Sequence, residues 1–158
     1  MLIFASAFVP KIDGVSLRCT HLLKNLNAMG YETILLCSYE GAPDFYDGTR
    51  IIKLPSFQPL NYSESRIAYP FPILTLLKSF FQFKPDIVHF IGPEFVYIPT
   101  AIVAKLLNIP VIGSYHFNVN AWLDSQDKWT RVTLHWMKYC QVFFFFFFFF
   151  FFFFFFFF

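Results

Sequence analysis

Residues 8–16 read FVPKIDGVS and join a short apolar run, residues 2–5, to a segment with helical periodicity. We predict a buried strand, a loop and then a helix that begins near Ser16, with the Ser16 side chain as its N-cap. The first backbone N–H groups of a helix have no partners within it, and the helix dipole adds positive charge there. Gly14 would let a ligand approach the backbone closely. The stretch therefore predicts a loop that binds an anion such as a phosphate.

Apolar runs alternate with helical patterns along the rest of the chain. We predict further strands at residues 33–37, 50–54, 87–91 and 111–115, and helices at residues 16–29, 72–83, 97–107 and 129–140. Gly30 follows the first helical pattern and is predicted to end that helix. The polar segments 39–48 and 56–69 are predicted to be irregular. This alternation of strands and helices predicts an α/β domain with a mostly parallel sheet.

Three of the predicted loops follow the carboxyl ends of strands, at residues 10–15, 92–94 and 116–120. In an open α/β sheet the carboxyl ends of parallel strands meet at one edge, and ligands bind at the point of that edge where the strand order reverses. We therefore expect the polar groups of these three loops to converge on one binding site.

Residues 143–158 are sixteen consecutive phenylalanines, out of 27 Phe in the 158-residue chain. This run is shorter than the roughly 17–25 residues that a membrane-spanning helix needs. An uninterrupted T tract in the nucleic acid would be translated as such a run. We interpret it as a sequence or gene-model artefact, with a real hydrophobic tail as the alternative. Residues 1–142 are then predicted to form one domain with its own core.

Charge, cysteine and histidine patterns argue against several classes of protein. The formal net charge of +2 is spread along the chain without a basic run, so no nucleic-acid partner is expected. Cys19, Cys37 and Cys140 are widely spaced, which predicts buried thiols in a reducing compartment rather than disulfides or a zinc site. The four histidines lack the spacing of metal ligands, and no metal is expected.

Two apolar segments raise the question of a membrane. The first nine residues lack a charged leader region and a cleavage site, so we predict a strand, no signal peptide and a cytoplasmic protein. Residues 74–81 read LTLLKSFF and could rest peripherally on a membrane surface. Because their apolar side chains occupy more than one helical face, burial against the sheet is the favoured interpretation.

Three segments in register resemble motifs of the retaining family 4 glycosyltransferases. They are residues 8–15 (FVPKIDGV), residues 84–93 (KPDIVHFIGP) and residues 109–116 (IPVIGSYH). The resemblance extends over residues 2–140. Within the family, residues 40–46 and 114–116 are most similar to the sulfolipid (sulfoquinovosyldiacylglycerol) synthases, followed by the lipid α-mannosyltransferases.

The resemblance implies one half of a GT-B fold, which has two Rossmann-like domains. The chain is similar to the N-terminal, acceptor-side domain, a Rossmann-like parallel sheet with flanking helices. The C-terminal donor-binding domain is absent from the sequence, so we expect this fragment alone to be inactive. The chain departs from the family pattern at Ile91, Phe117 and Asn120, where a second His, a Thr and a Pro are usual. These departures leave the identity of the acceptor open.

The same resemblance implies an activity and its participants. A hexose would pass with retention from a nucleotide sugar, a UDP- or GDP-sugar, to a lipid or glycan acceptor, without a further cofactor. The backbone at Gly14 and Val15 would contact the donor phosphates, and Asp13 would lie near the acceptor. His116 would reach the transferred sugar as the catalytic residue.

Four further polar residues are considered as candidate site residues, three of them with two interpretations. Arg18, Glu94 and Asn118 are assigned to acceptor binding. For Arg18, a solvated helix residue is the preferred interpretation. Glu94 is equally explained as a favourable charge at a helix N-terminus. For His89, a hydrogen-bonded core histidine is preferred to a ligand-binding one.

Two other functions remain as alternatives. The first is a truncated, non-catalytic remnant of a glycosyltransferase. The second is an NAD-dependent oxidoreductase with a Rossmann domain. The second is disfavoured because the G-x-G-x-x-G fingerprint is missing after the first strand and because no acidic residue ends the second strand at residues 37–38.

Overall fold

The computed structural model describes residues 1–58, 66–69, 72–92, 94 and 96–114. The chain divides into two compact units, Met1–His116 and Phe117–Phe158, and the described residues all belong to the first. The predicted helix at residues 129–140, the phenylalanine run and the site residues His116 and Asn118 lie outside the described residues.

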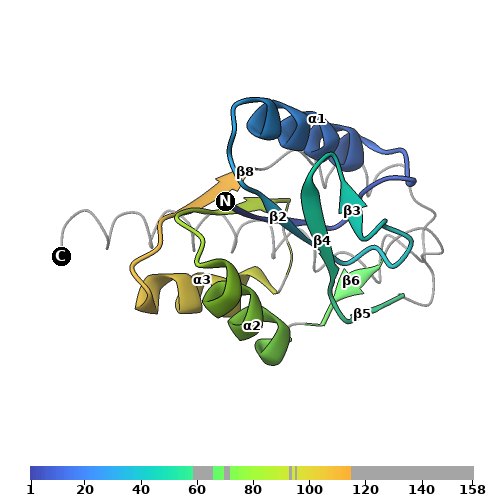
Figure 1. Cartoon of the computed structure of the whole chain (residues 1–158). Coiled ribbons are helices and arrows are strands. Elements are labelled where there is room, and N and C mark those ends of the chain that lie inside the picture. Colours follow the sequence, from blue (N-terminus) through green and yellow to red (C-terminus); the bar gives the residue numbers. More distant parts are fainter. Residues whose placement is uncertain (59–65, 70–71, 93, 95, 115–158) are drawn as a thin grey trace. The chain divides into compact units, whose positions relative to one another are not determined.

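The described residues form a six-stranded sheet in the order β3-β4-β2-β1-β7-β8, with three flanking helices (Figure 1). The parallel strands are β1 (Leu2–Ala5), β2 (Ile34–Cys37), β4 (Thr49–Lys53), β7 (Val88–Ile91) and β8 (Val111–Ser114). The helices are α1 (Gly14–Ala28), α2 (Ile73–Phe83) and α3 (Tyr97–Leu106). The predicted Rossmann-like α/β class, a mostly parallel sheet with flanking helices, is confirmed.

The helices cover the two faces of the sheet, with α1 on one face and α2 and α3 on the other (Figure 1). Alternate residues of a strand point to opposite faces, and β1 is buried along its whole length. Ile3 packs with Cys19 and Leu23 of α1. On the other face the Phe4 ring meets the Phe90 ring edge to face at 5.2 Å. Burial on both faces explains why these strands are continuous apolar runs.

The start of α1 corrects one prediction. The helix begins at Gly14, and its N-cap is Asp13, whose side chain accepts a hydrogen bond from the Ser16 N–H at 2.8 Å. Ser16 lies in the first turn and is buried, so it is not the N-cap. At the other end the prediction is confirmed, since Gly30 has a φ of 81°, a conformation that favours glycine.

Three short strands occur where irregular chain was predicted. β3 (Phe45–Tyr46) pairs antiparallel with β4 through a two-residue turn, Asp47 and Gly48, both with positive φ. β5 (Ser56–Phe57) and β6 (Ile67–Ala68) form a separate two-stranded sheet. β5 and β6 were missed because each has only two residues and shows no apolar alternation.

The strand order reverses at β1, which pairs with β2 on one side and with β7 on the other. The chain leaves β1 through α1 and returns in β2, and it later reaches β7 on the opposite side of β1. This is the topological switch point of an open α/β sheet, and the carboxyl ends of β1, β2 and β7 lie there side by side. We call the described residues that follow these three ends, 6–15, 38–39, 92 and 94, the switch-point edge.

Candidate functional site

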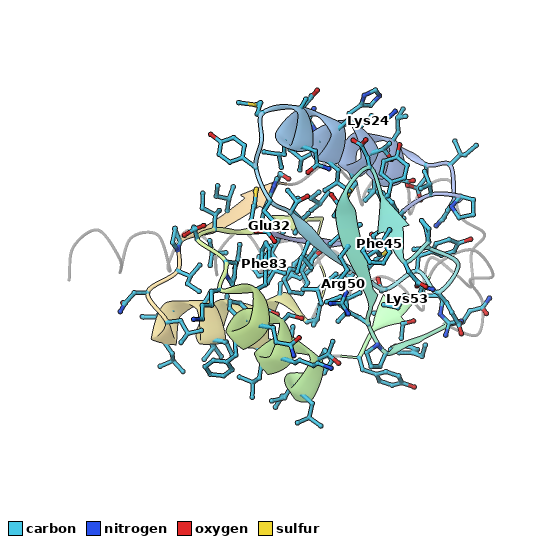
Figure 2. All side chains as sticks on the ribbon, in the orientation of Figure 1. Lys24, Glu32, Phe45, Arg50, Lys53 and Phe83 are labelled. Carbon is cyan, nitrogen blue, oxygen red and sulfur yellow. The ribbon has the colours of Figure 1, made fainter. Side chains whose placement is uncertain are left out.

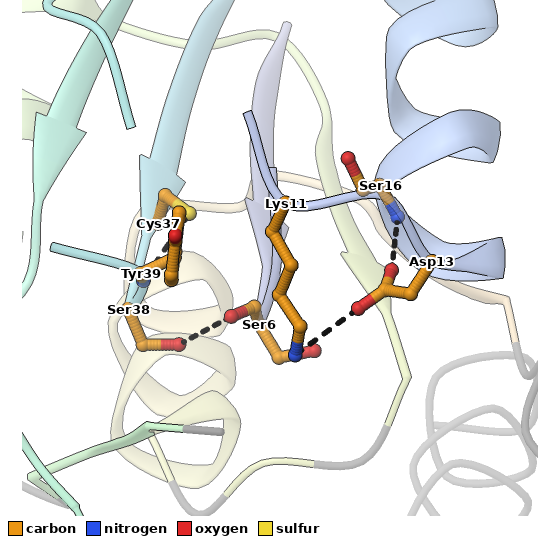
Figure 3. Close-up of polar contacts among 7 residues, drawn as sticks. All are labelled: Ser6, Lys11, Asp13, Ser16, Cys37, Ser38 and Tyr39. Atoms are coloured by element: carbon orange, nitrogen blue, oxygen red, sulfur yellow. Dashed lines mark hydrogen bonds and ion pairs between the residues drawn. The ribbon is translucent and has the colours of Figure 1, made fainter. Parts of the chain in front are cut away.

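Asp13 fixes the loop between β1 and α1. One carboxylate oxygen accepts the hydrogen bond from the Ser16 N–H, and the other lies 3.2 Å from the Lys11 Nζ (Figure 3). Lys11 and Asp13 are both largely removed from solvent, which strengthens a charged pair relative to an exposed one. Because both carboxylate oxygens have partners in the chain, the structure gives Asp13 a positioning role. Its predicted contact with an acceptor stays a prediction.

The first turn of α1 presents backbone N–H groups at the switch-point edge. The Ser16 N–H is bound by the Asp13 side chain and the Leu17 N–H by the Asp13 carbonyl oxygen. Within the described part of the chain, the N–H groups of Gly14 and Val15 have no hydrogen-bond acceptor. Two oriented donors at the positive end of a helix are suited to phosphate oxygens.

Nothing in the described chain requires a glycine at position 14. Its φ lies outside the left-handed region, and a Cβ built on it meets no atom within 4 Å. Gly14 is also exposed. A glycine that neither the backbone nor the packing demands is explained if something from outside approaches the helix end closely.

Arg18 is exposed and lies one helical turn beyond Gly14, on the same side of α1. The structure therefore brings Asp13, Gly14, Val15 and Arg18 together at one end of α1. It does not decide between acceptor binding and solvation for the Arg18 guanidinium.

Glu94 reaches across the switch-point edge from the loop after β7. Its Oε1 accepts a hydrogen bond from the Ser38 Oγ at 3.1 Å, and its carboxylate also accepts one from the Ala68 N–H of β6. The Ser38 hydroxyl, directly after β2, also lies 3.3 Å from the carbonyl oxygen of Ser6, directly after β1. The Ser6–Ser38 contact is drawn in Figure 3. Glu94 thus connects the ends of three neighbouring strands.

Burial raises the pKa of Glu94 to about 7, and the hydrogen bonds from Ser38 and Ala68 only partly oppose this shift. Sequence reasoning singled out Glu94 but missed Ser6 and Ser38. The available signal was their position, because each is the first polar residue after a buried strand.

His89 has the structural partner that the sequence analysis preferred. Its Nε2 lies 2.7 Å from the Ser114 Oγ at the end of β8, and the histidine is half-buried. The pair joins β7 to β8 through side chains, in addition to the parallel ladder between them. The described chain ends at residue 114, two residues before His116, so neither His116 nor Asn118 is placed relative to the other site residues.

The two described thiols, those of Cys19 and Cys37, are unsuited to act as nucleophiles. Cys19 and Cys37 are free and buried, as predicted for them, whereas Cys140 lies outside the described residues. Burial raises the pKa of both thiols, that of Cys37 to about 12, so they stay protonated at neutral pH and are poor nucleophiles. Among the described residues, no group of three His, Cys, Asp or Glu side chains is arranged to hold a metal ion.

A family model described as Glycosyltransferase Family 4 matches residues 12–144 of the chain. Among curated proteins, sulfoquinovosyl transferase SQD2 of Arabidopsis thaliana is 27% identical over 126 residues, which are 80% of this chain and 23% of that protein. A GDP-mannose-dependent alpha-mannosyltransferase of Corynebacterium glutamicum is 28% identical over 123 residues, 74% of this chain and 29% of that protein.

A third relative, the alpha-monoglucosyldiacylglycerol synthase of Streptococcus pneumoniae, is 25% identical over 114 residues, 72% of this chain and 26% of that protein. The chain therefore spans only about a quarter of the length of these relatives.

Proposed function

Because the chain belongs to glycosyltransferase family 4, we propose that it is the acceptor-side half of an enzyme that transfers a hexose from a nucleotide sugar to a lipid or glycan. The name of one of the three relatives supports a lipid-linked product, since it contains a diacylglycerol unit. The same family membership argues against the oxidoreductase alternative.

One observation carries this proposal. At the switch-point edge, the N–H groups of Gly14 and Val15 point away from the helix end with no acceptor in the described chain, and Gly14 leaves the approach to them open. Donors oriented in advance stabilise the charge that develops on a departing diphosphate at no further cost in ordering. We assign these two residues to the donor phosphates, and Asp13 to holding their loop in place.

The proposed mechanism is a front-face transfer with retention. The bond between the anomeric carbon and the diphosphate oxygen breaks, and the acceptor oxygen bonds to the same face of the sugar. The protein contributes by orienting donor and acceptor and by stabilising the leaving group. His116, which follows the last residue of β8 by two positions in the sequence, would bind the transferred sugar.

We further propose that a second, C-terminal domain supplies the donor pocket. The short coverage of the relatives supports this division, with residues 1–142 as the acceptor-side domain and the phenylalanine run outside it as an artefact. A truncated remnant with no activity is the competing possibility.

The experiment is a transfer assay on the full-length protein encoded by the gene that carries this sequence. UDP- and GDP-sugars are supplied with lipid and glycan acceptors, and the anomeric configuration of the product is read by NMR. His116→Ala should lower turnover at least about tenfold, because a hydrogen-bonding or proton-transferring group at the reacting sugar is lost. His21→Ala, at an exposed position on α1, is the control and should be neutral.

Near wild-type turnover in His116→Ala would refute the role of that histidine. Transcripts that stop directly after the phenylalanine codons, together with no transfer, would establish the remnant instead.

We also propose peripheral contact with an anionic membrane through α2 and α3. The inner residues Leu76 and Phe80 of α2 are buried, as the sequence pattern predicted. The outer sides of the two helices expose large apolar residues, among them Ile73, Leu74, Phe81, Ile102 and Leu106. Figure 2 shows side chains of both helices directed away from the sheet. No helix among the described residues is long and apolar enough to cross a membrane.

The charge of this outer surface matches an anionic lipid headgroup layer. Lys78, Lys84 and Lys105 are exposed on or next to the two helices, which contain no acidic residue. Apolar side chains framed by cations are typical of helices that lie in a membrane interface. Burial against the sheet and contact with a membrane therefore involve opposite sides of α2.

Sedimentation with vesicles of anionic lipid tests this contact. Leu74→Ser should lower the partition coefficient about tenfold, because an 85% exposed leucine would lose its apolar contact with the bilayer. Met29→Ser is the matched control, since Met29 is 69% exposed but lies after α1 on the other face of the sheet. Equal losses in the two variants, or equal binding to uncharged vesicles, would contradict the contact.

A further inference from the structure

Around Glu94 there are more hydrogen-bond acceptor sites than there are donors to fill them. The carboxylate offers about four acceptor sites, and the Ser6 carbonyl oxygen offers two more. In the described chain two donors reach the carboxylate, the Ser38 hydroxyl and the Ala68 N–H. The Ser38 hydroxyl has one hydrogen, and both Glu94 Oε1 and the Ser6 oxygen lie within its reach. The cluster formed by the Glu94 carboxylate, the Ser38 hydroxyl and the Ser6 carbonyl oxygen therefore has unfilled acceptor sites and too few donor hydrogens.

No positive charge compensates Glu94 within the described residues. Glu94 is in none of the three ion pairs Lys11–Asp13, Lys53–Asp44 and Arg66–Glu40 that join described residues. The raised pKa of the Glu94 carboxyl agrees with this, because burial is its largest cause and no cation opposes it. A second negative group brought next to this carboxylate would be repelled with little screening.

The cluster lies at the switch-point edge, where Ser38 is buried and Ser6 and Glu94 are each partly exposed. Ser6 and Ser38 follow β1 and β2, and Glu94 follows β7, so the acceptors stand on both sides of the point where the strand order reverses. Glu94 is only half-buried. The same edge carries the open Gly14 end of α1.

We propose that Glu94, Ser38 and the Ser6 carbonyl oxygen form an acceptor subsite that binds the hydroxyl groups of an uncharged polyol and rejects a phosphate-bearing one. A polyol brings the hydrogens that the cluster lacks and no negative charge. Glu94 is then a specificity-determining residue, and the acceptor has a neutral hydroxylated headgroup. This inference rests on the proposed function, because it names the acceptor class of that reaction.

The test compares sorbitol with sorbitol 6-phosphate in NMR titrations of the full chain at about pH 8, where a phosphate monoester carries close to two charges. The amide signals of residues 38, 68 and 94 and the Glu94 carboxyl carbon report binding. Sorbitol should bind at least about tenfold more tightly than its phosphate. The Glu94 carboxyl signal should shift with sorbitol and not with an equal concentration of the phosphate.

Two matched variants assign the selectivity to Glu94. Glu94→Gln removes the charge and should bring the two dissociation constants to within about twofold. Glu40→Gln makes the same change at an exposed carboxylate, paired with Arg66, and should leave the ratio unaltered. If Glu94→Gln does not fold, the test is the Glu94 carboxyl carbon signal of the unmodified chain, which should shift with sorbitol and not with sorbitol 6-phosphate.

The proposal is overturned if sorbitol does not bind, if both probes bind equally, or if Glu94→Gln keeps the ratio. Tighter binding of sorbitol 6-phosphate that Arg18→Gln abolishes would also overturn it, in favour of an acceptor phosphate on α1. If the selectivity for sorbitol is absent but the full-length protein transfers sugar normally, this inference is overturned and the proposed function stands. Retained selectivity without any transfer would instead overturn the proposed function alone.

Discussion

Gly14→Val is expected to weaken binding of the nucleotide-sugar donor by the full-length protein about 100-fold and to leave its melting temperature almost unchanged. A valine side chain at the first position of α1 would stand where the diphosphate must approach the N–H groups of Gly14 and Val15. Losing two charge-assisted hydrogen bonds to phosphate accounts for a change of this size.

The fold should tolerate this substitution for two reasons. A Cβ at position 14 meets no atom within 4 Å, and the backbone there is not left-handed. Gly14 is also exposed, so the valine methyl groups displace solvent and not core side chains. Titration calorimetry with the donor gives the affinity, and thermal unfolding of the same samples gives the stability.

Two further variants make the result specific. Gly14→Ala adds one methyl group and should give an intermediate loss of affinity. Ala28→Val adds bulk at an exposed position at the other end of α1 and should leave donor binding unaltered. Unchanged donor affinity in Gly14→Val would contradict the assignment of the Gly14 and Val15 N–H groups to the donor phosphates, on which the proposed function depends.

The sheet was predictable because its parallel strands are buried on both faces. β1, β2, β7 and β8 each appear in the sequence as an apolar run, and the predicted bounds agree with the structure to within one residue at each end. Burial on both faces removes the polar alternation that would otherwise obscure a strand, and Gly or Pro residues mark many of the boundaries.

The β3–β4 hairpin was missed although its signal was present. Asp47 and Gly48 form a two-residue turn in which both residues have positive φ, and Asp-Gly is a strong sequence indication of such a turn. The pairing of β5 with β6 had no comparable signal. It joins residues 56–57 to residues 67–68 across a segment without periodicity.

The candidate site was predictable in its location and less so in its contacts. The rule for open α/β sheets placed Gly14 and Glu94 at one edge, and the structure agrees. The Ser38–Glu94 hydrogen bond joins residues 56 positions apart, which no local pattern encodes. Asp13 and Ser16 are both good N-cap residues, and only the backbone shows that the helix begins at Gly14.

Glu94 should make the folded chain less stable above neutral pH than in mild acid. Burial raises the pKa of Glu94 from the usual 4.5 to about 7 in the folded chain. Between these two values the folded chain holds a proton that the unfolded chain has released, so the free energy of unfolding decreases as the pH rises. The contribution is fully present below about pH 4.5 and is lost once the pH has passed about 7.

The expected loss is on the order of 3 kcal/mol, because each unit by which the folded and unfolded pKa values differ is worth about 1.4 kcal/mol. Urea unfolding of the chain at about pH 5 and about pH 8 measures it. Tyr97 and Cys37, which face Glu94, do not titrate in this range because burial raises both of their pKa values, that of Cys37 to about 12. Among these three neighbouring groups, Glu94 therefore accounts for the change in the free energy of unfolding between about pH 5 and about pH 8.

Glu94→Gln should remove that part of the pH dependence, because glutamine stays neutral at both pH values while retaining an oxygen that accepts a hydrogen bond from Ser38. The variant should consequently be more stable than the unmodified chain at about pH 8 and close to it at about pH 5. Glu40→Gln, at an exposed carboxylate, should keep the full loss. An equal loss in Glu94→Gln would show that the Glu94 carboxyl is ionised without penalty at the switch-point edge, and the repulsion of phosphate inferred there would then have no physical basis.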